Sequence, residues 1–334
     1  ILLELKRHEP LPVPDLPAEP GVPVSAPDWP VAVGTVRLFD LPNIGSLAAS
    51  APQLLVAGAG SNDGWRGADC WIVASAGAEP IPVGTVRPAA ALGELALPLA
   101  AGSDCLFDLL NSVEVQLVNP AMTLESVGDA ALLGGANRAI VDGELLQFGI
   151  AEAIEPGRWR LSRLLRGRAG TESEMTHAAG AFFVLLDDPA LLTLPETLAG
   201  LAESGGATLE WAPRGGTMLT EIGVPAAGRA LRPLAPVHGQ VRADGAGGVT
   251  IGWVRRSRAD AGWRDHVDQP LGESREAWRI ALSPPIPGIG PWESTSPTLN
   301  IGAAELAALP PGCEIEIRQA GDFALSPPLS LPLT

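Results

Sequence analysis

Prolines and glycines recur along the whole chain at a density that works against long helices. The 334 residues include 33 prolines and 39 glycines, and these do not follow the three-residue period of collagen. Proline removes a backbone donor and glycine favours turns, so the pattern predicts many short strands joined by turns. Hydrophobic residues make up 46% of the chain and charged residues 18%, which is enough apolar surface for two or three domains. We therefore expect a mainly β protein.

The charge balance excludes some classes of partner. There are 22 basic and 38 acidic side chains, for a net charge of −16. Nucleic acids and anionic membranes are bound by clustered lysines and arginines, so we expect no nucleic-acid partner. The longest stretch without charge, residues 41–62, is interrupted by prolines and polar residues, and this argues against a membrane span.

Four regions differ in their patterns. Residues 1–30 read as a proline-rich connector, residues 31–195 as a β-rich domain, residues 196–235 as a linking segment and residues 236–334 as a C-terminal β-sandwich. In the second region, the expected strands are 31–39, 53–57, 70–74, 81–86, 94–99, 112–117, 139–141, 144–154, 158–165 and 181–186. Turns at Asp142-Gly143 and Pro156-Gly157 predict a three-stranded meander over residues 139–165, and residues 130–135 read as a helical turn.

The last hundred residues resemble a fibronectin type III domain. About seven short strands are expected there, as in a β-sandwich, with Trp253, Trp278 and Ile280 facing inward. A Leu-Pro-Pro-Gly turn precedes a strand that carries Ile315 and Ile317. The fibronectin pattern normally has a tyrosine where Ile315 stands. This chain has no tyrosine, so packing alone must fix that corner.

Few residue patterns indicate catalysis. No G-x-S-x-G, P-loop or dinucleotide-binding motif occurs, and no Cys/His cluster has the spacing of a zinc site. The carboxylates Glu144, Glu152, Asp187 and Asp188 are expected to be solvated or to lie in turns. The three cysteines, Cys70, Cys105 and Cys313, are expected to be buried as small apolar residues. We expect no enzymatic activity, catalytic residue, metal or cofactor.

Two tryptophans flank a turn that is rich in Asn, Asp and Gly. The segment SNDGWRGADCW, residues 61–71, lacks the ligand spacing of a calcium loop. The simplest interpretation is a turn with Trp65 packed over it as a lid. The alternative is that Trp65 and Trp71 form a platform on which a sugar ring of a receptor glycan stacks.

The most distinctive string is WRLSRLLRGRAGTESEMTHAAGAFFVLLDD, residues 159–188. It carries three arginines within six residues, Arg163, Arg166 and Arg168, followed by a loop with Glu172, Glu174 and His177. Such arginines can bind an anion or clamp acidic side chains and loop carbonyls. We favour an internal clamp on Glu172, Glu174 and loop carbonyls, because arginines beside a glycine turn often fix carbonyl groups.

Several long strings occur in the same order as in a known family. They include PVPDLP, LLGGANRAIVDGELLQFGIAEAI, LLRGRAGTE, ALRPLAPVH and VTIGWVRRSRADAGWRDHVDQPLGESREAWRI. Together they resemble the C-terminal region of the tail-tip hub protein of gene transfer agents and related siphophages. The resemblance implies a β-rich virion component that is trimeric about the tail axis, contacts other tail-tip or baseplate proteins and acts in tip assembly and host attachment. It implies assembly in the bacterial cytoplasm and a final location at the tail tip, and it transfers no catalytic residue.

Two other functions remain open. One is a glycan-binding adhesin module of a bacterial surface or prophage protein, which would bind host-surface polysaccharide through the exposed tryptophans. The weaker one is a glycoside hydrolase, because the family carries a glycosidase-like domain upstream of the matching region.

Overall fold

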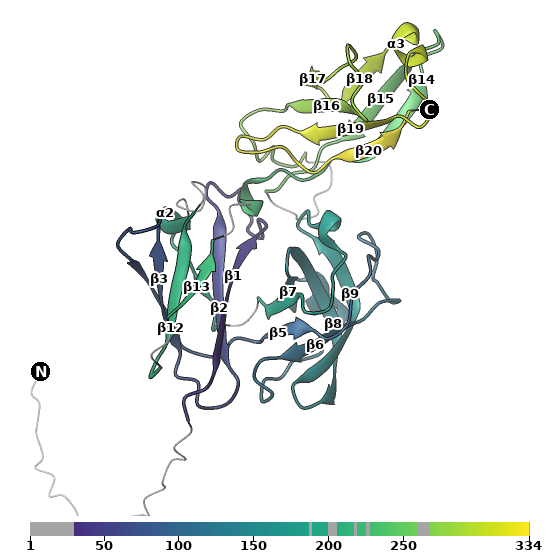
Figure 1. Cartoon of the computed structure of the whole chain (residues 1–334). Helices are drawn as coiled ribbons and strands as arrows, with labels where there is room; N and C mark the ends of the chain where they lie inside the picture. The colour runs from purple at the N-terminus through teal and green to yellow at the C-terminus, as the bar shows by residue number, and fades with distance from the viewer. Residues whose placement is uncertain are drawn as a thin grey trace, which may run out of the picture.

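The computed structural model describes residues 30–186, 189–199, 206–216, 219–224, 228–259 and 268–333. In these ranges the protein is mainly β, as predicted, and its helices are short. The strands form three units, which we call the first sandwich, the barrel and the C-terminal sandwich (Figure 1). No helix in the described ranges is both long enough and apolar enough to cross a membrane. The predicted connector, residues 1–30, lies outside the described ranges except for Pro30.

The first sandwich consists of two antiparallel sheets. One sheet has the order β1 (Gly34–Leu41), β2 (Gln53–Gly60) and β11 (Leu192–Thr193), and the other has the order β13 (Thr220–Gly223), β12 (Thr208–Pro213), β3 (Ala68–Val73) and β4 (Ile81–Val86). A short helix, α2 (Glu196–Ala199), follows β11. Val36, Val56, Ile72 and Leu209 meet between the sheets. The region expected to link two domains therefore supplies β12 and β13 to a sheet whose other strands lie far upstream.

The barrel is inserted into the first sandwich between β4 and β11. Its six strands close in the order β10 (Phe182–Leu185), β5 (Leu92–Leu95), β6 (Val113–Leu117), β9 (Arg158–Arg168), β8 (Glu144–Glu155) and β7 (Arg138–Val141). A helix, α1 (Asp129–Leu133), precedes β7, and a 3₁₀ helix, η1 (Glu172–Glu174), follows β9. The predicted meander is confirmed, because β7, β8 and β9 pair consecutively. Gly157, at φ +75°, makes the second turn.

The barrel and the first sandwich share an apolar interface. Strand β2 is buried along almost its entire length, which fits a sequence that is continuously apolar rather than alternating. One of its faces packs inside the sandwich. The other contributes Leu55, which joins Phe39 of β1 and the barrel residues Ile140 and Val184 in one buried cluster. The two units are therefore held together by core packing.

The C-terminal sandwich is of the fibronectin type III kind. A sheet of β14 (Val237–Ala243), β15 (Val249–Val254) and β18 (Thr298–Ile301) packs on a sheet of β17 (Trp292–Ser294), β16 (Trp278–Ser283), β19 (Glu314–Gln319) and β20 (Leu329–Pro332). A short helix, α3 (Ala303–Ala307), follows β18. The rings of Trp253 and Trp278 meet edge to face, with centroids 5.4 Å apart. Ile315 is completely buried, so apolar packing occupies the usual tyrosine corner.

Arginines join the C-terminal sandwich to the other two units. A connector with the 3₁₀ helix η3 (Arg229–Leu231) precedes β14. Arg229 donates from Nη1 to Glu174 at 3.2 Å, and Arg256 donates from Nη1 to Glu172 at 2.7 Å. Arg258 is buried and donates to the carbonyl oxygens of Ala49 (2.5 Å) and Ala230 (3.1 Å). The acids of η1 thus hold arginines of the connector and of the C-terminal sandwich.

Candidate functional site

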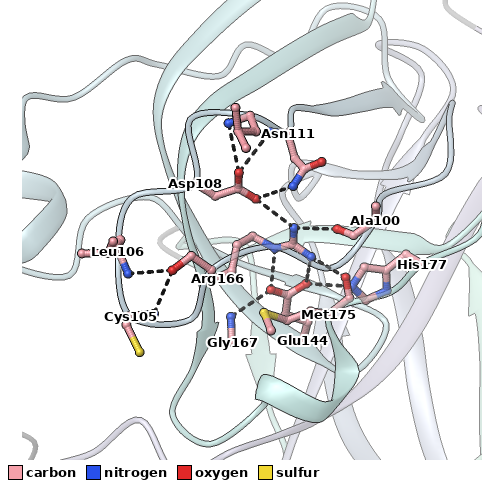
Figure 2. Close-up of polar contacts among 12 residues, drawn as sticks. Ala100, Cys105, Leu106, Asp108, Asn111, Glu144, Arg166, Gly167, Met175 and His177 are labelled. Carbon is pink, nitrogen blue, oxygen red and sulfur yellow. Dashed lines mark hydrogen bonds and ion pairs between the residues drawn. The ribbon is translucent and has the colours of Figure 1, made fainter.

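Arg166 is the centre of a buried polar cluster in the barrel. It lies near the end of β9, and its side chain has no exposed surface. The planar guanidinium forms a bidentate ion pair with Glu144 at the start of β8, through Nε to Oε1 at 2.7 Å and Nη2 to Oε2 at 2.9 Å. Figure 2 shows these contacts and the loops that converge on them. Glu144 lies there because β8 begins directly after the Asp142-Gly143 turn and pairs antiparallel with β9, which sets the start of β8 against the end of β9.

The remaining guanidinium donors bind two loops. Nη2 donates to the carbonyl oxygen of Met175 at 2.5 Å, and Nη1 donates to the carbonyl oxygen of Ala100 at 3.1 Å and lies 3.5 Å from Asp108. An arginine has five N–H donors, and each one of Arg166 has a protein acceptor. Arg166 therefore has no donor left for a ligand, which decides the choice between an anion site and an internal clamp in favour of the clamp.

Both oxygens of Glu144 are also fully engaged. Oε1 accepts the backbone N–H of Gly167 at 2.9 Å, and Oε2 lies 2.8 Å from Nε2 of His177, which is itself buried. Burial works to raise the pKa of Glu144, but the hydrogen bonds from His177 and Arg166, the charge of Arg166 and the Gly167 N–H outweigh it, so the pKa lies below its ordinary value. Because Glu144 is ionised, Nε2 of His177 carries the shared proton.

Asp108 anchors the loop between β5 and β6. Its carboxylate accepts the backbone N–H groups of Leu110 and Asn111 and the side-chain amide of Asn111, the last at 2.7 Å (Figure 2). Burial works to raise the pKa of Asp108, but the bonds from Asn111 and Leu110 and the charge of Arg166 lower it overall. The loop backbone also bridges Leu164 of β9. The cluster thus fixes the loops around residues 100–111 and 175–177 to the same two strands.

The arrangement is built for rigidity rather than for chemistry on a substrate. Glu144 is inaccessible to solvent, and its lone pairs are occupied by Arg166, Gly167 and His177. A general acid or base must reach the proton that it transfers, and this carboxylate reaches only protein donors. Across the described ranges, no group of three or more His, Cys, Asp or Glu side chains could hold a metal ion.

The three predicted arginines do not act together. Arg163 forms a bidentate pair with Asp129 of α1, with distances of 2.7 and 2.6 Å, and lies over the ring of Phe107. Arg168 is exposed and makes no side-chain hydrogen bond or ion pair within the described part of the chain. Arg166 clamps loop carbonyls as expected, but the acids assigned to the clamp were wrong. Glu172 and Glu174 bind arginines from outside the barrel, and the clamped acid is Glu144.

The two predicted tryptophans lie on different sides of one sheet. The ring of Trp65 packs inside the first sandwich, where it would lie 2.7 Å from a Cβ on Gly34 and 3.0 Å from a Cβ on Gly60. This is the lid arrangement. Trp71 alternates with the buried Cys70 and Ile72 on β3 and therefore faces the outside. The structure does not bring the two rings together into one platform for a sugar.

Other expectations need correction. Glu144 is fully buried rather than solvated, because Arg166 and His177 compensate its charge. Glu152 is exposed, as expected, and Asp187 and Asp188 lie outside the described residues. Cys70 and Cys313 are buried, whereas Cys105 is exposed on the loop that Asp108 anchors.

Sequence reasoning missed Glu144 and Asp108 as partners of Arg166. An acid directly after a tight hairpin turn was the only local signal for Glu144. Asp108 carried no signal, because its contact with Arg166 spans 58 positions of the chain.

One comparison with known proteins coincides with this unit. Residues 90–184 match a protein-family model described as Rcc01698-like, C-terminal. The matched segment begins just before β5 and ends within β10, so it coincides with the barrel and contains the whole Arg166 cluster. It covers well under half of the chain. No curated protein matches the chain.

Proposed function

We propose that the chain is a structural component of the tail tip or baseplate hub of a phage or gene transfer agent, which acts in tip assembly and host attachment. The observation that carries the proposal is that the family-model match and the barrel cover nearly the same residues. The family-model match ends where the barrel ends, and the strings that resemble the tail-tip family include those that build the barrel. On this proposal the protein works at the virion tail tip after assembly in the bacterial cytoplasm.

The internal cross-links support a structural role. The Arg166 cluster ties two strands and two loops of the barrel together. The barrel shares an apolar interface with the first sandwich. Arg229 and Arg256 bind Glu174 and Glu172 and so fasten the C-terminal sandwich to the barrel. A part that holds its neighbours in fixed positions benefits from such cross-links. We further propose a homotrimer that contacts other tail-tip proteins, and no enzymatic activity.

The decisive test is to locate the chain. Immunogold electron microscopy with antibodies against the chain, on particles released by the source bacterium, should place gold at the distal tail tip. A strain that lacks the gene provides the control and should release no particle with a labelled tail tip. Gold on the cell envelope, with unlabelled particles, would reject the proposal and favour the adhesin module.

A further inference from the structure

Three hollows lie end to end along the side of the molecule where the C-terminal sandwich meets the barrel. The first, of about 370 Å³, lies on β14, β15 and β18 around Gly252. It shares His238 and Val254 with the second, of about 470 Å³. The second shares Leu234 and Ser257 with the third, of about 270 Å³, which reaches α1 and β8 of the barrel. Because neighbouring hollows share lining residues, we treat the three as one groove and call it the arginine groove.

The groove is positive in a strongly negative protein. Its lining includes the six arginines Arg138, Arg168, Arg242, Arg255, Arg256 and Arg258. Among the described residues, the lining holds one acidic side chain, Asp268, which pairs with Arg255 at 2.8 Å. Arg256 and Arg258 pair with Glu172 and Glu273 from outside the lining, so the six arginines still outnumber these three acids. The chain as a whole has a net charge of −16. A recess lined by one sign of charge concentrates ligands of the other sign, so the groove favours an anion.

Two of these arginines have donors to spare. Arg256 uses Nη1 to bind Glu172, but its Nε and Nη2 atoms are enclosed and have no hydrogen-bond partner in the described residues. Enclosed donors without an acceptor cost stability, so an anion in the second hollow would gain bonds from Arg256 once its guanidinium turns toward the hollow. Arg168 lines the third hollow and, as described above, makes no side-chain bond within the described residues.

Two backbone features border the first hollow, a glycine without a side chain and a β-bulge. Gly252 forms part of its lining, and a Cβ there would meet only the carbonyl oxygen of Pro297, at 3.9 Å. His238 is held at φ +53° beside a bulge that shifts the pairing between Val237 and Gln240. Bulges redirect side chains and occur often beside functional sites. Here the bulge falls where the first and second hollows join.

We propose that the arginine groove binds an acidic polysaccharide through the carboxylates of its sugars. The three adjoining hollows favour an extended ligand, and their arginines favour an anionic one. A nucleic acid would need bases to stack on exposed aromatic rings, and within the described residues the only aromatic side chain in the lining, Trp253, is buried in the sandwich core. This inference extends the host-attachment part of the proposed function by naming a ligand class and a site away from Trp65 and Trp71.

The test is binding of the whole chain to polygalacturonate, a polymer of uronic acid, by isothermal titration calorimetry. We expect binding that weakens with added salt and no binding of neutral dextran. Arg168→Ala and Gly252→Val should each weaken it at least about fivefold, through loss of a charge-assisted bond and filling of the groove. Both positions have room for the change, so the thermal unfolding midpoint should stay close to that of the native chain.

Matched variants show whether the effect belongs to the groove. Arg87→Ala removes an exposed arginine elsewhere, Gly223→Val adds a side chain to β13 where a Cβ would meet nothing within 4 Å, and Trp71→Ala removes the outer tryptophan. All three should bind normally. The inference is overturned if polygalacturonate does not bind, if these controls weaken binding as much as the groove variants, or if single-stranded DNA binds more tightly. Binding without label on particles would reject only the tail-tip proposal.

Discussion

Arg166 and Glu144 form a bidentate ion pair in which neither side chain has any exposed surface. Such a pair must be complete to be tolerated, because each charge has lost its water. The pair joins the two longest strands of the barrel, and the cluster around it leaves neither partner short of hydrogen bonds.

Removal of the arginine alone should be severe. Arg166→Met leaves Glu144 charged and buried, and we expect the free energy of unfolding in urea to fall by about 3–5 kcal/mol. The control is Arg163→Met, because Arg163 lies on the same strand as Arg166 but pairs with the exposed Asp129 of α1. This variant should leave the urea midpoint nearly unchanged. The double variant Arg166→Met/Glu144→Leu should recover much of the loss. Equal effects of the two single variants would contradict a special role for the buried pair.

The same pair predicts the behaviour of the protein in acid. The pKa of Glu144 is lower in the folded state than in the unfolded chain, so its ionised form contributes stability above the unfolded pKa. That contribution is lost as the pH falls through the lower, folded pKa. Urea unfolding from neutral to acidic pH should show this loss, and the pH dependence should become shallower in Glu144→Gln. The exposed Glu152→Gln provides the control and should keep the native profile.

Asp40 should have the opposite dependence. It is buried at the end of β1, where its carboxylate accepts the backbone N–H of Arg229, and burial raises its pKa despite that bond and the charges of Arg229 and Arg232. An acid with a raised pKa in the folded state costs stability as the pH rises from its unfolded to its folded pKa. Asp40→Asn should therefore gain stability relative to the native chain across that window. A constant difference at all pH values would contradict this.

A substitution at one glycine of the barrel measures how tightly the connector packs against it. Gly170 has φ +84°, and a Cβ there would lie 2.2 Å from Cδ2 of Leu234. Gly170→Ala should cost about 1–2 kcal/mol from backbone strain and crowding. Gly180 has a similar φ of +86° but no atom within 4 Å of a Cβ, so Gly180→Ala measures the strain alone. Leu234→Ala should reduce the difference between the two variants, as measured by chemical denaturation.

The three cysteines should differ in reactivity. Cys105 is exposed, whereas burial raises the pKa of Cys70 to about 11. We expect one thiol of the native chain to react with Ellman's reagent and the buried ones to react only after unfolding. The hydrogen bond and the charge of Asp104 raise the pKa of Cys105, so Asp104→Ala should speed the reaction at neutral pH by increasing the thiolate fraction. An unchanged rate would show that Asp104 does not control this thiol.

Local patterns predicted much of the secondary structure. Strand β4 has the expected bounds, and the Asp142-Gly143 turn correctly predicted a hairpin, because alternation and turn chemistry act over a few residues. The pairing of strands into sheets and a closed barrel could not be predicted from these local patterns. Closure of the barrel depends on the pairing of β7 with β10, and no local pattern reports a contact between strands so far apart.

The candidate site shows the same limit. The cluster of arginines in residues 163–168 contains Arg166, and this arginine binds loop carbonyls. Its acidic partner was misassigned, because Glu172 is close in sequence whereas Glu144 becomes close only when β8 and β9 pair. The same holds for the tryptophans, since Trp65 and Trp71 are near neighbours in the chain but are separated by the sheet that contains β3.

The insertion of the barrel has a consequence during synthesis on the ribosome. Strand β2 pairs with β11 and β3 pairs with β12, so half of each of these pairings is translated before the barrel and half after it. At ordinary elongation rates of about 5–20 residues per second, the roughly 100 inserted residues take about 5–20 s to make. The barrel cannot close until its last strand, β10, has been made, so β2 and β3 expose unpaired edges throughout that interval. The nascent chain should therefore depend most on chaperones just before β11 and β12 emerge.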